Sequence, residues 1–292
     1  MYAEKTDYDD IEMSSRLRNI LRRNGFESLE GLREYPKEYF IKMEEFDTSY
    51  LAWILYKLFY GIDKEVAKNK ERSYVEIDFG NKIINMSGDT DYNFGPGWSH
   101  SIRKKYENYL EKVPSEYEDL YNTQLRRCVK LYKSVLNISF MPQTGNLQSA
   151  KKGIGNDRLD TFIWALNSYY IDETSLLFNN STFNNTSYLK EYLDLFKTEQ
   201  KEETIYNYCY KIYGIESHEL VDELIMHGKE AIDSPEKVIA YMNRAYRFWC
   251  QKLVYIKKRM ECNIDILTDN EQTIILQSVE DAENELNKWF ET

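Results

Sequence analysis

A basic loop with two glycines, leading into a predicted helix, has the residue types best suited to chemistry in this chain. The loop carries Lys151, Lys152, Gly153 and Gly155 and ends at Asn156, a residue type that often caps helices. Glycine lets the backbone approach a ligand closely, and a helix start offers unpaired N–H groups and the positive end of the helix dipole. The loop can therefore hold phosphate or carboxylate, although its spacing matches neither the P-loop nor the dinucleotide-binding fingerprint.

The same residues also have a purely structural interpretation. Glycine and asparagine commonly provide turn and cap geometry. Asp157 and Asp160 lie in the first turn of the predicted helix, where a carboxylate interacts favourably with the helix dipole. In this interpretation any anion site is secondary.

The distribution of charge favours an anionic ligand near this loop. The 292 residues carry a formal charge of -11, which argues against nonspecific binding to DNA or to anionic lipid. Between residues 124 and 160, however, seven bases outnumber two acids and give a local charge of +5. The bases are Arg126, Arg127, Lys130, Lys133, Lys151, Lys152 and Arg158. This island predicts a phosphate-bearing ligand, either a nucleotide or a nucleic acid.

A candidate site can be assembled from the loop and its flanks. The predicted ligand-binding residues are Arg103, Lys151, Lys152, Gly153, Gly155, Asn156 and Arg158, and the candidate acid-base residues are His100, Asp157 and Asp160. In an enzyme, Arg103 and Arg158 would stabilise charge, and His100 or Asp160 would transfer protons. A lone histidine at a helix start is equally consistent with a structural hydrogen bond. The sequence identifies no cofactor and leaves open whether a reaction follows binding.

A second polar segment precedes this site. Asp89, Asp91 and Asn93 alternate and could offer oxygens to a divalent cation, but the glycine and the closing glutamate of an EF-hand loop are missing. Asp and Asn are also common in turns, which is the structural alternative. The four cysteines lie far apart, and together with three histidines they form no zinc-binding pattern.

Periodicity predicts a mainly α-helical fold with a small β element. Hydrophobic content of 42% is typical of a globular protein, and the chain is long enough to bury a substantial core. A β-hairpin is predicted near 73–86 and a further strand at 137–141, with helices elsewhere. A charged stretch at 64–72 divides a small helical domain, residues 1–70, from a larger α-rich domain, residues 71–292.

The remaining sequence features concern the cellular setting. No run approaches 18 apolar residues, and the segment after Met1 lacks the apolar region of a secretory signal. We therefore expect a protein without a membrane span, located in the cytoplasm, with reduced thiols.

The N-terminal helices resemble a known DNA-binding module. Residues 16–58 read RLRNILRRNGFESLEGLREYPKEYFIKMEEFDTSYLAWILYKL and resemble the helix-hairpin-helix domain at the C-terminus of the bacterial RNA polymerase α subunit. Related modules place a glycine-containing hairpin before the last helix, whereas this chain has Glu45-Phe46-Asp47-Thr48 there. Because two acids replace groups that would face DNA phosphate, the resemblance implies packing or protein docking rather than DNA binding.

Residues 75–260 resemble an uncharacterised family of bacterial proteins common in Gram-positive genomes. The matching segments are Asp89-Thr90, Ser101-Ile102-Arg103-Lys104-Lys105-Tyr106, Thr144-Gly145 through Lys152-Gly153, Asp157-Arg158-Leu159-Asp160, and the helix from Tyr241 to Arg259. The chain departs from the pattern at Ile102, where the family has leucine, and no second glycine directly follows Gly145. The resemblance implies that Arg103, the loop over 145–155 and the segment 157–160 converge on one site.

A second function competes with anion binding. The sequence lacks a legible metal motif or nucleophile constellation and is rich in tyrosine, with 25 residues of this type. These features fit a noncatalytic protein-protein interaction protein of a mobile element or phage-defence system, docking its partner through residues 1–70. The sequence alone does not decide between the two functions.

Overall fold

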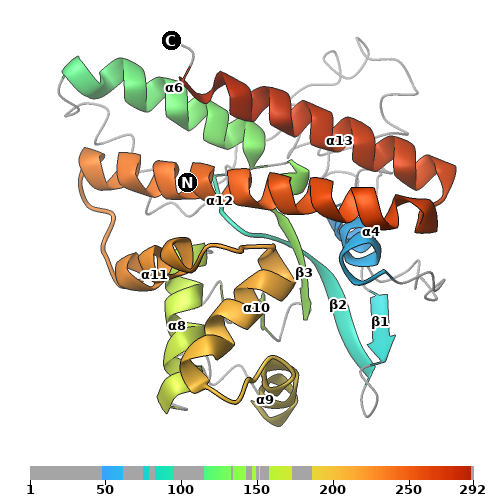
Figure 1. Ribbon diagram of the computed structural model, residues 1–292. Coiled ribbons are helices and arrows are strands. Elements are labelled where there is room, and N and C mark those ends of the chain that lie inside the picture. The colour runs from blue at the N-terminus through green and yellow to red at the C-terminus, as the bar shows by residue number, and fades with distance from the viewer. Residues whose placement is uncertain are drawn as a thin grey trace, which may run out of the picture.

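Helices form most of the structure, and one small antiparallel sheet lies among them (Figure 1). The computed structural model describes residues 48–61, 75–78, 83–94, 115–132, 134–142, 147–148, 151, 158–172 and 186–290, and every structural statement below concerns these residues. The helices are α4 (Thr48–Tyr60), α6 (Ser115–Leu131), α8 (Leu159–Asp172), α9 (Thr186–Asp194), α10 (Thr204–Tyr213), α11 (His218–His227), α12 (Pro235–Asn263) and α13 (Asp269–Asn287). This architecture confirms the predicted mainly α fold with a small β element.

The sheet has three strands in the order β1-β2-β3. They are β1 (Val75–Asp78), β2 (Ile83–Thr90) and β3 (Ile138–Pro142), and both neighbouring pairs are antiparallel. Strand β2 is longer than the second arm of the predicted hairpin, because its far half pairs with β3, with Asp89 opposite Ser139. The acidic segment therefore begins on a strand rather than in a turn.

Long helices and short helices gather on different sides of the sheet. In Figure 1, α6, α12 and α13 run close together across one side, and α8, α10 and α11 form a second group beside β3. Helix α12 is the longest at 29 residues and connects the two groups. A continuous core of buried apolar and aromatic side chains fills the space between these layers.

Local sequence signals explain where the C-terminal helices begin. The Ser234 hydroxyl accepts a hydrogen bond from the Lys237 N–H, and proline follows at the first position of α12. At the start of α13, Thr268 and Glu271 form a reciprocal capping box that satisfies two exposed backbone donors. These caps set the residues at which α12 and α13 begin.

Helix α4 is attached to α12 and α13 by polar contacts. Lys57 forms an ion pair with Glu271, with 2.8 Å between Nζ and Oε2, and both side chains are about nine-tenths buried. Arg259 and Asn263 donate hydrogen bonds to backbone carbonyls at the end of α4, including that of Leu58. The described end of the predicted N-terminal module thus contacts the larger domain, while residues 1–47 and the predicted boundary at 64–72 lie outside the described part.

We expect Lys57→Met to lower the free energy of unfolding by about 3 kcal/mol, because it leaves the buried Glu271 carboxylate without its cation. The matched control is Lys257→Met, which removes a half-exposed lysine paired with Glu283 and should cost less than about 1 kcal/mol. Urea denaturation of both variants measures the difference. Equal losses in the two variants would show that the Lys57 pair does not anchor α4.

Candidate anion-binding site

The start of α8 holds a tight pair of opposite charges. Arg158 donates from Nε to Asp160 Oδ1 at 3.0 Å and from Nη2 to Asp160 Oδ2 at 2.7 Å, in the two-pronged geometry that arginine makes with carboxylates. Asp160 Oδ1 also accepts the backbone N–H of Thr161, as an acid in the first helical turn can. Asp160 is fully buried, and Arg158 is 8% exposed.

The end of α11 fixes this pair in place. Arg158 donates to the carbonyl oxygens of Glu230 at 2.7 Å and His227 at 3.3 Å, and Thr161 donates to the carbonyl of Gly228 at 2.8 Å. The two segments approach so closely at Gly228 that a Cβ atom there would lie 2.3 Å from Cβ of Trp164. Glycine is therefore required at position 228, and the start of α8 is held rigidly.

Arg244 brings a second arginine to the same carboxylate from α12. Its Nη2 atom lies 3.6 Å from Asp160 Oδ2, which is beyond hydrogen-bonding distance. Its Nε atom has no hydrogen-bond partner among the described residues, although the residue is only 3% exposed. Arg244 is thus a buried cation that the described residues compensate only weakly.

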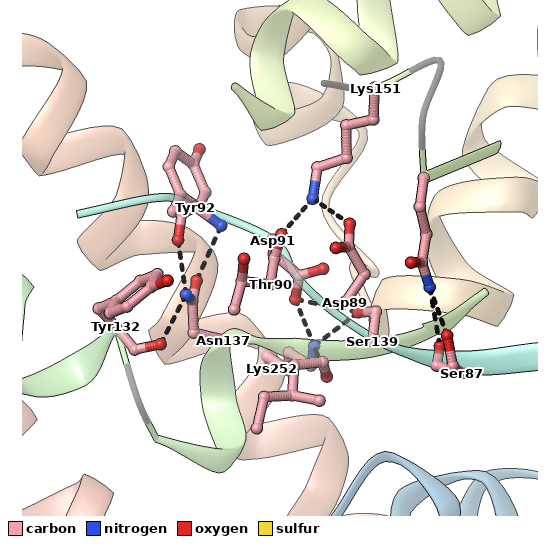
Figure 2. A network of polar contacts seen from close by, with 12 residues as sticks. Ser87, Asp89, Thr90, Asp91, Tyr92, Tyr132, Asn137, Ser139, Lys151 and Lys252 are labelled. Atoms are coloured by element: carbon pink, nitrogen blue, oxygen red, sulfur yellow. Dashed lines mark hydrogen bonds and ion pairs between the residues drawn. The ribbon is translucent and has the colours of Figure 1, made fainter. Parts of the chain in front are cut away.

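Tyr92, just after β2, supplies a second unused donor. Asn137 holds its backbone on both sides, accepting from the Tyr92 N–H at 2.9 Å and donating to the Tyr92 carbonyl at 2.6 Å (Figure 2). The Tyr92 hydroxyl is buried and has no partner within the described part of the chain. Burial is the main reason why the pKa of this hydroxyl is raised well above its usual value, with the nearby Asp160 carboxylate adding to the effect. The hydroxyl therefore stays protonated and can donate.

An aromatic ring lies beside the guanidinium groups of both arginines. The ring centroid of Tyr241, one turn before Arg244 on α12, lies 5.6 Å from Cζ of Arg158 and 5.9 Å from Cζ of Arg244. Its centroid is 5.3 Å from that of Tyr92. Cation–π contacts of this kind stabilise a guanidinium but satisfy none of its N–H groups in the plane of the group.

The arrangement combines cations with unused donors. Among the described residues, two arginines lie within ion-pair distance of the one Asp160 carboxylate. Arg244 Nε and the Tyr92 hydroxyl add two donors without acceptors. Buried donors and charges are costly unless they are paired, so this group is chemically suited to receive an oxyanion.

The structure describes three of the residues predicted to form the site. It brings Arg158 and Asp160 into direct contact and places Lys151 in a separate polar network. The other predicted residues, which are His100, Arg103, Lys152, Gly153, Gly155, Asn156 and Asp157, lie outside the described residues. The predicted convergence of the loop, Arg103 and segment 157–160 stays a prediction.

Lys151 is bound by acceptors of the protein itself. Its Nζ atom lies 2.9 Å from Asp89 Oδ2 and also donates to the carbonyl of Thr90 (Figure 2). The residue is completely buried. The sequence predicted that Lys151 binds a ligand. In the structure, Lys151 pairs with the Asp89 carboxylate.

Lys252 of α12 forms the companion pair in this network (Figure 2). Its Nζ atom donates to Asp91 Oδ2 and to the Ile138 carbonyl, both at 2.6 Å, and to the Ser139 hydroxyl at 2.8 Å. Burial lowers the pKa of Lys252, and the Asp91 carboxylate opposes this shift. Because two lysines balance two aspartates, this network is neutral as a whole.

The network gives the acidic segment a role that neither sequence interpretation included. Asp89 and Asp91 alternate along β2 and its continuation, so both face the same side of the sheet and meet lysines there. Among the described residues, no three His, Cys, Asp or Glu side chains group as metal ligands would. The carboxylates therefore act as partners of buried lysines.

The predicted site residues included neither Arg244 nor Tyr92, yet a signal for Arg244 was present. Tyr241, Arg244 and Phe248 follow one another at intervals of three and four, so they share one face of α12. That face is aromatic and belongs to the core. A basic residue on such a face needs a buried partner, whereas nothing near Tyr92 in the sequence marks its hydroxyl.

Comparisons with protein-family models, with curated proteins and with solved structures found no match to this chain. Both sequence resemblances therefore stay predictions. None of the helices in the described ranges has the length and apolar character needed to cross a bilayer. The site must be interpreted from its own geometry.

We expect Lys252→Met to lower the free energy of unfolding by about 3–5 kcal/mol, since it leaves the Asp91 carboxylate buried without a cation. Adding Asp91→Asn should restore part of that loss, because the amide carries no charge. The matched control, Lys258→Met, removes an exposed lysine of the same helix and should change little. Thermal unfolding of the three variants measures this order, and no recovery in the double variant would contradict the pairing.

Proposed function

We propose that this protein binds the anionic group of a small phosphate-bearing molecule between the start of α8, the middle of α12 and the end of β2. The observation that carries the proposal is Arg244, which is nearly fully buried and makes no hydrogen bond to the described residues through Nε. Arg158 shares the Asp160 carboxylate with Arg244, and the charge of Arg244 acts on the Tyr92 hydroxyl. A bound oxyanion would satisfy these donors together.

Energetics favour an external partner for Arg244. An unpaired buried ion costs several kcal/mol, roughly the size of a large mutational effect on stability. Asp160 gives Arg244 only partial relief, because Arg158 already engages both of its oxygens at 2.7 and 3.0 Å. An anion that joins Arg244 would convert this cost into binding free energy.

The geometry favours a small molecule over a nucleic acid chain. Arg244 and Tyr92 are both buried, so the bound group must leave water almost completely. A continuous phosphate backbone approaches exposed basic surfaces, and this chain carries a formal charge of -11. A nucleotide or similar metabolite meets both conditions.

The proposal assigns different work to the predicted basic residues. Arg244 and Tyr92 donate to the ligand. Arg158 contributes charge, and its hydrogen bonds to Asp160 and to the Glu230 carbonyl after α11 fix the geometry of the site. Lys151 belongs to the neutral network with Asp89 and serves the structure. The loop at 152–156 directly precedes Arg158 in the chain, so its predicted anion-binding amides remain part of the proposal.

We also propose a cytoplasmic setting for this function. Small phosphorylated metabolites are the expected ligands, and all four cysteines are free thiols, two of them buried. Burial raises the pKa of the Cys128 and Cys209 thiols, which makes both poor nucleophiles and poor targets of oxidation. These thiols fit a reducing compartment.

Titration with adenosine 5′-monophosphate tests the proposal. At a concentration about 100 times Kd, the ligand should add about 2.7 kcal/mol to the free energy of unfolding of the natural chain. Arg244→Met should abolish this gain, because the uncompensated cation is gone. Isothermal calorimetry at pH 6.0 gives Kd, and thermal unfolding reports the gain.

Arg247→Met provides the matched control. Arg247 lies on the same helix but is half exposed and paired with Glu223 and Glu219 of α11. Its removal takes the same charge from the protein and should leave ligand binding unchanged. The proposed site would be wrong if both variants lost ligand binding. It would also be wrong if Arg244→Met gave the same heats of binding as the natural chain.

A further inference from the structure

We propose that a cavity between α4, β3 and α10 binds a small aliphatic carboxylate, whose alkyl end enters the cavity while its charged end stays at the mouth. The cavity lies apart from the proposed anion site, because neither Arg244 nor Tyr92 lines it. The two sites are therefore independent of each other. Three features of the cavity support this assignment: its apolar walls, its volume and the donors at its mouth.

Apolar side chains form the walls of the cavity. They are Leu55 and Phe59 from α4, Ile138 and Phe140 from β3, and Ile212 from α10, and each is at most 9% exposed. Water finds few hydrogen-bond partners in such a space, whereas each methylene group that moves into it from water strengthens binding about 4-fold. The walls therefore favour an alkyl group over water.

The packing of α4 on the sheet explains why this space forms. Ile138 and Phe140 alternate along β3, so their side chains point to the same face of the sheet, and helix α4 packs against both β2 and β3. On β2, the residue opposite Phe140 is Gly88, which has no side chain. Helix α4 therefore covers this part of the sheet without filling all of the space between them.

The volume of the cavity restricts the alkyl group. The cavity measures about 30 Å³. One water molecule occupies about 30 Å³ of the liquid, and an apolar cavity that holds benzene measures about 150 Å³. The enclosed space therefore admits about one or two methyl or methylene groups, and an aromatic ring is too large for it.

The mouth of the cavity lies where α4 ends. Tyr60, the last residue of α4, is 42% exposed, and Lys211 of α10 is exposed as well; both line the cavity. The Tyr60 hydroxyl donates to the Lys211 carbonyl at 3.2 Å. The ring centroid of Tyr60 lies 4.6 Å from that of Tyr56, which also lines the cavity. These contacts connect Tyr56, Tyr60 and Lys211 along one edge.

Two donors at this edge are suited to a carboxylate. Among the described residues, Lys211 has no ion pair and the Tyr56 hydroxyl has no hydrogen bond. Burial raises the pKa of Tyr56 to about 12, so its hydroxyl stays protonated and can donate. The flexible stem of Lys211 lets its ammonium group reach a ligand at the mouth. One ammonium and one hydroxyl can each donate to one oxygen of the same carboxylate.

Methyl NMR of the full chain, labelled with ¹³C at leucine and isoleucine methyl groups, tests the proposal at about pH 7.5, where a carboxylate is ionised. Sodium hexanoate should shift the resonances of Leu55, Ile138 and Ile212. From propionate to octanoate, about one or two of the single-carbon steps should raise the affinity about 4-fold each, because only these groups enter the cavity. Sodium 4-phenylbutyrate should bind at least about 10-fold more weakly than hexanoate, because its ring does not fit.

Three variants test the mouth. Tyr56→Phe keeps the ring and should weaken hexanoate binding about 10-fold, since it removes a hydrogen bond to a charged group. Lys211→Met should weaken it about 3-fold, the effect of an exposed ion pair. The matched control, Lys201→Met, removes the same charge from an exposed residue that does not line the cavity and should leave hexanoate binding unchanged.

Each feature of the cavity has an outcome that would contradict its role. Hexanoate that leaves all three methyl resonances unshifted overturns the site. Equal affinity for hexanoate, 1-hexanol and hexylammonium overturns the assignment of a carboxylate, as does equal weakening in Lys211→Met and Lys201→Met. Binding of 4-phenylbutyrate as tight as that of hexanoate overturns the limit that the volume sets on the ligand.

Discussion

The pairing of charges buried between β2, α8 and α12 is the constraint on which the rest of this structure depends. A charge removed from water must find a partner inside the protein, or else its burial lowers stability by several kcal/mol. Lys151 pairs with Asp89 and Lys252 pairs with Asp91, and these ion pairs connect the sheet to α12 (Figure 2). The same requirement is only partly met at Arg244.

The two polar clusters are continuous along the chain and yet differ in their pairing. Asp91 and Tyr92 are consecutive residues, and Arg244 and Lys252 are separated by about two turns of α12. One end of this shared scaffold is neutral and holds the strands in register. The other end holds Arg244 Nε and the Tyr92 hydroxyl, which have no acceptor among the described residues, and the network on one side can hold these groups in fixed positions.

Sequence patterns could predict the parts of the fold that depend on neighbouring residues. Ser234 followed by Pro235 marks the start of α12, and the structure confirms it because capping depends on only four residues. The extension of β2 to Thr90 depends on pairing with β3, about 50 residues away, and no local pattern contains that information. For the same reason, the alternating aspartates suggested turns or a cation when their partners are lysines.

The candidate site shows the same division. Asp160 and Arg158 are two residues apart, so the sequence could place them together at a helix start. Arg244 reaches them from 84 residues further along the chain, and only the packing of α12 against α8 and β2 reveals its position. The sequence located the charged helix start, and the tertiary structure revealed the second cation beside it.

The most direct test is the free energy of unfolding of Arg244→Met measured without any added anion, in a buffer free of phosphate and sulfate. If Arg244 is an uncompensated buried cation, its replacement by an apolar side chain of similar length should leave the free energy of unfolding unchanged or raise it by about 1 kcal/mol. A loss of about 3 kcal/mol or more would show that the protein itself already compensates this charge, and the anion site would have no physical basis.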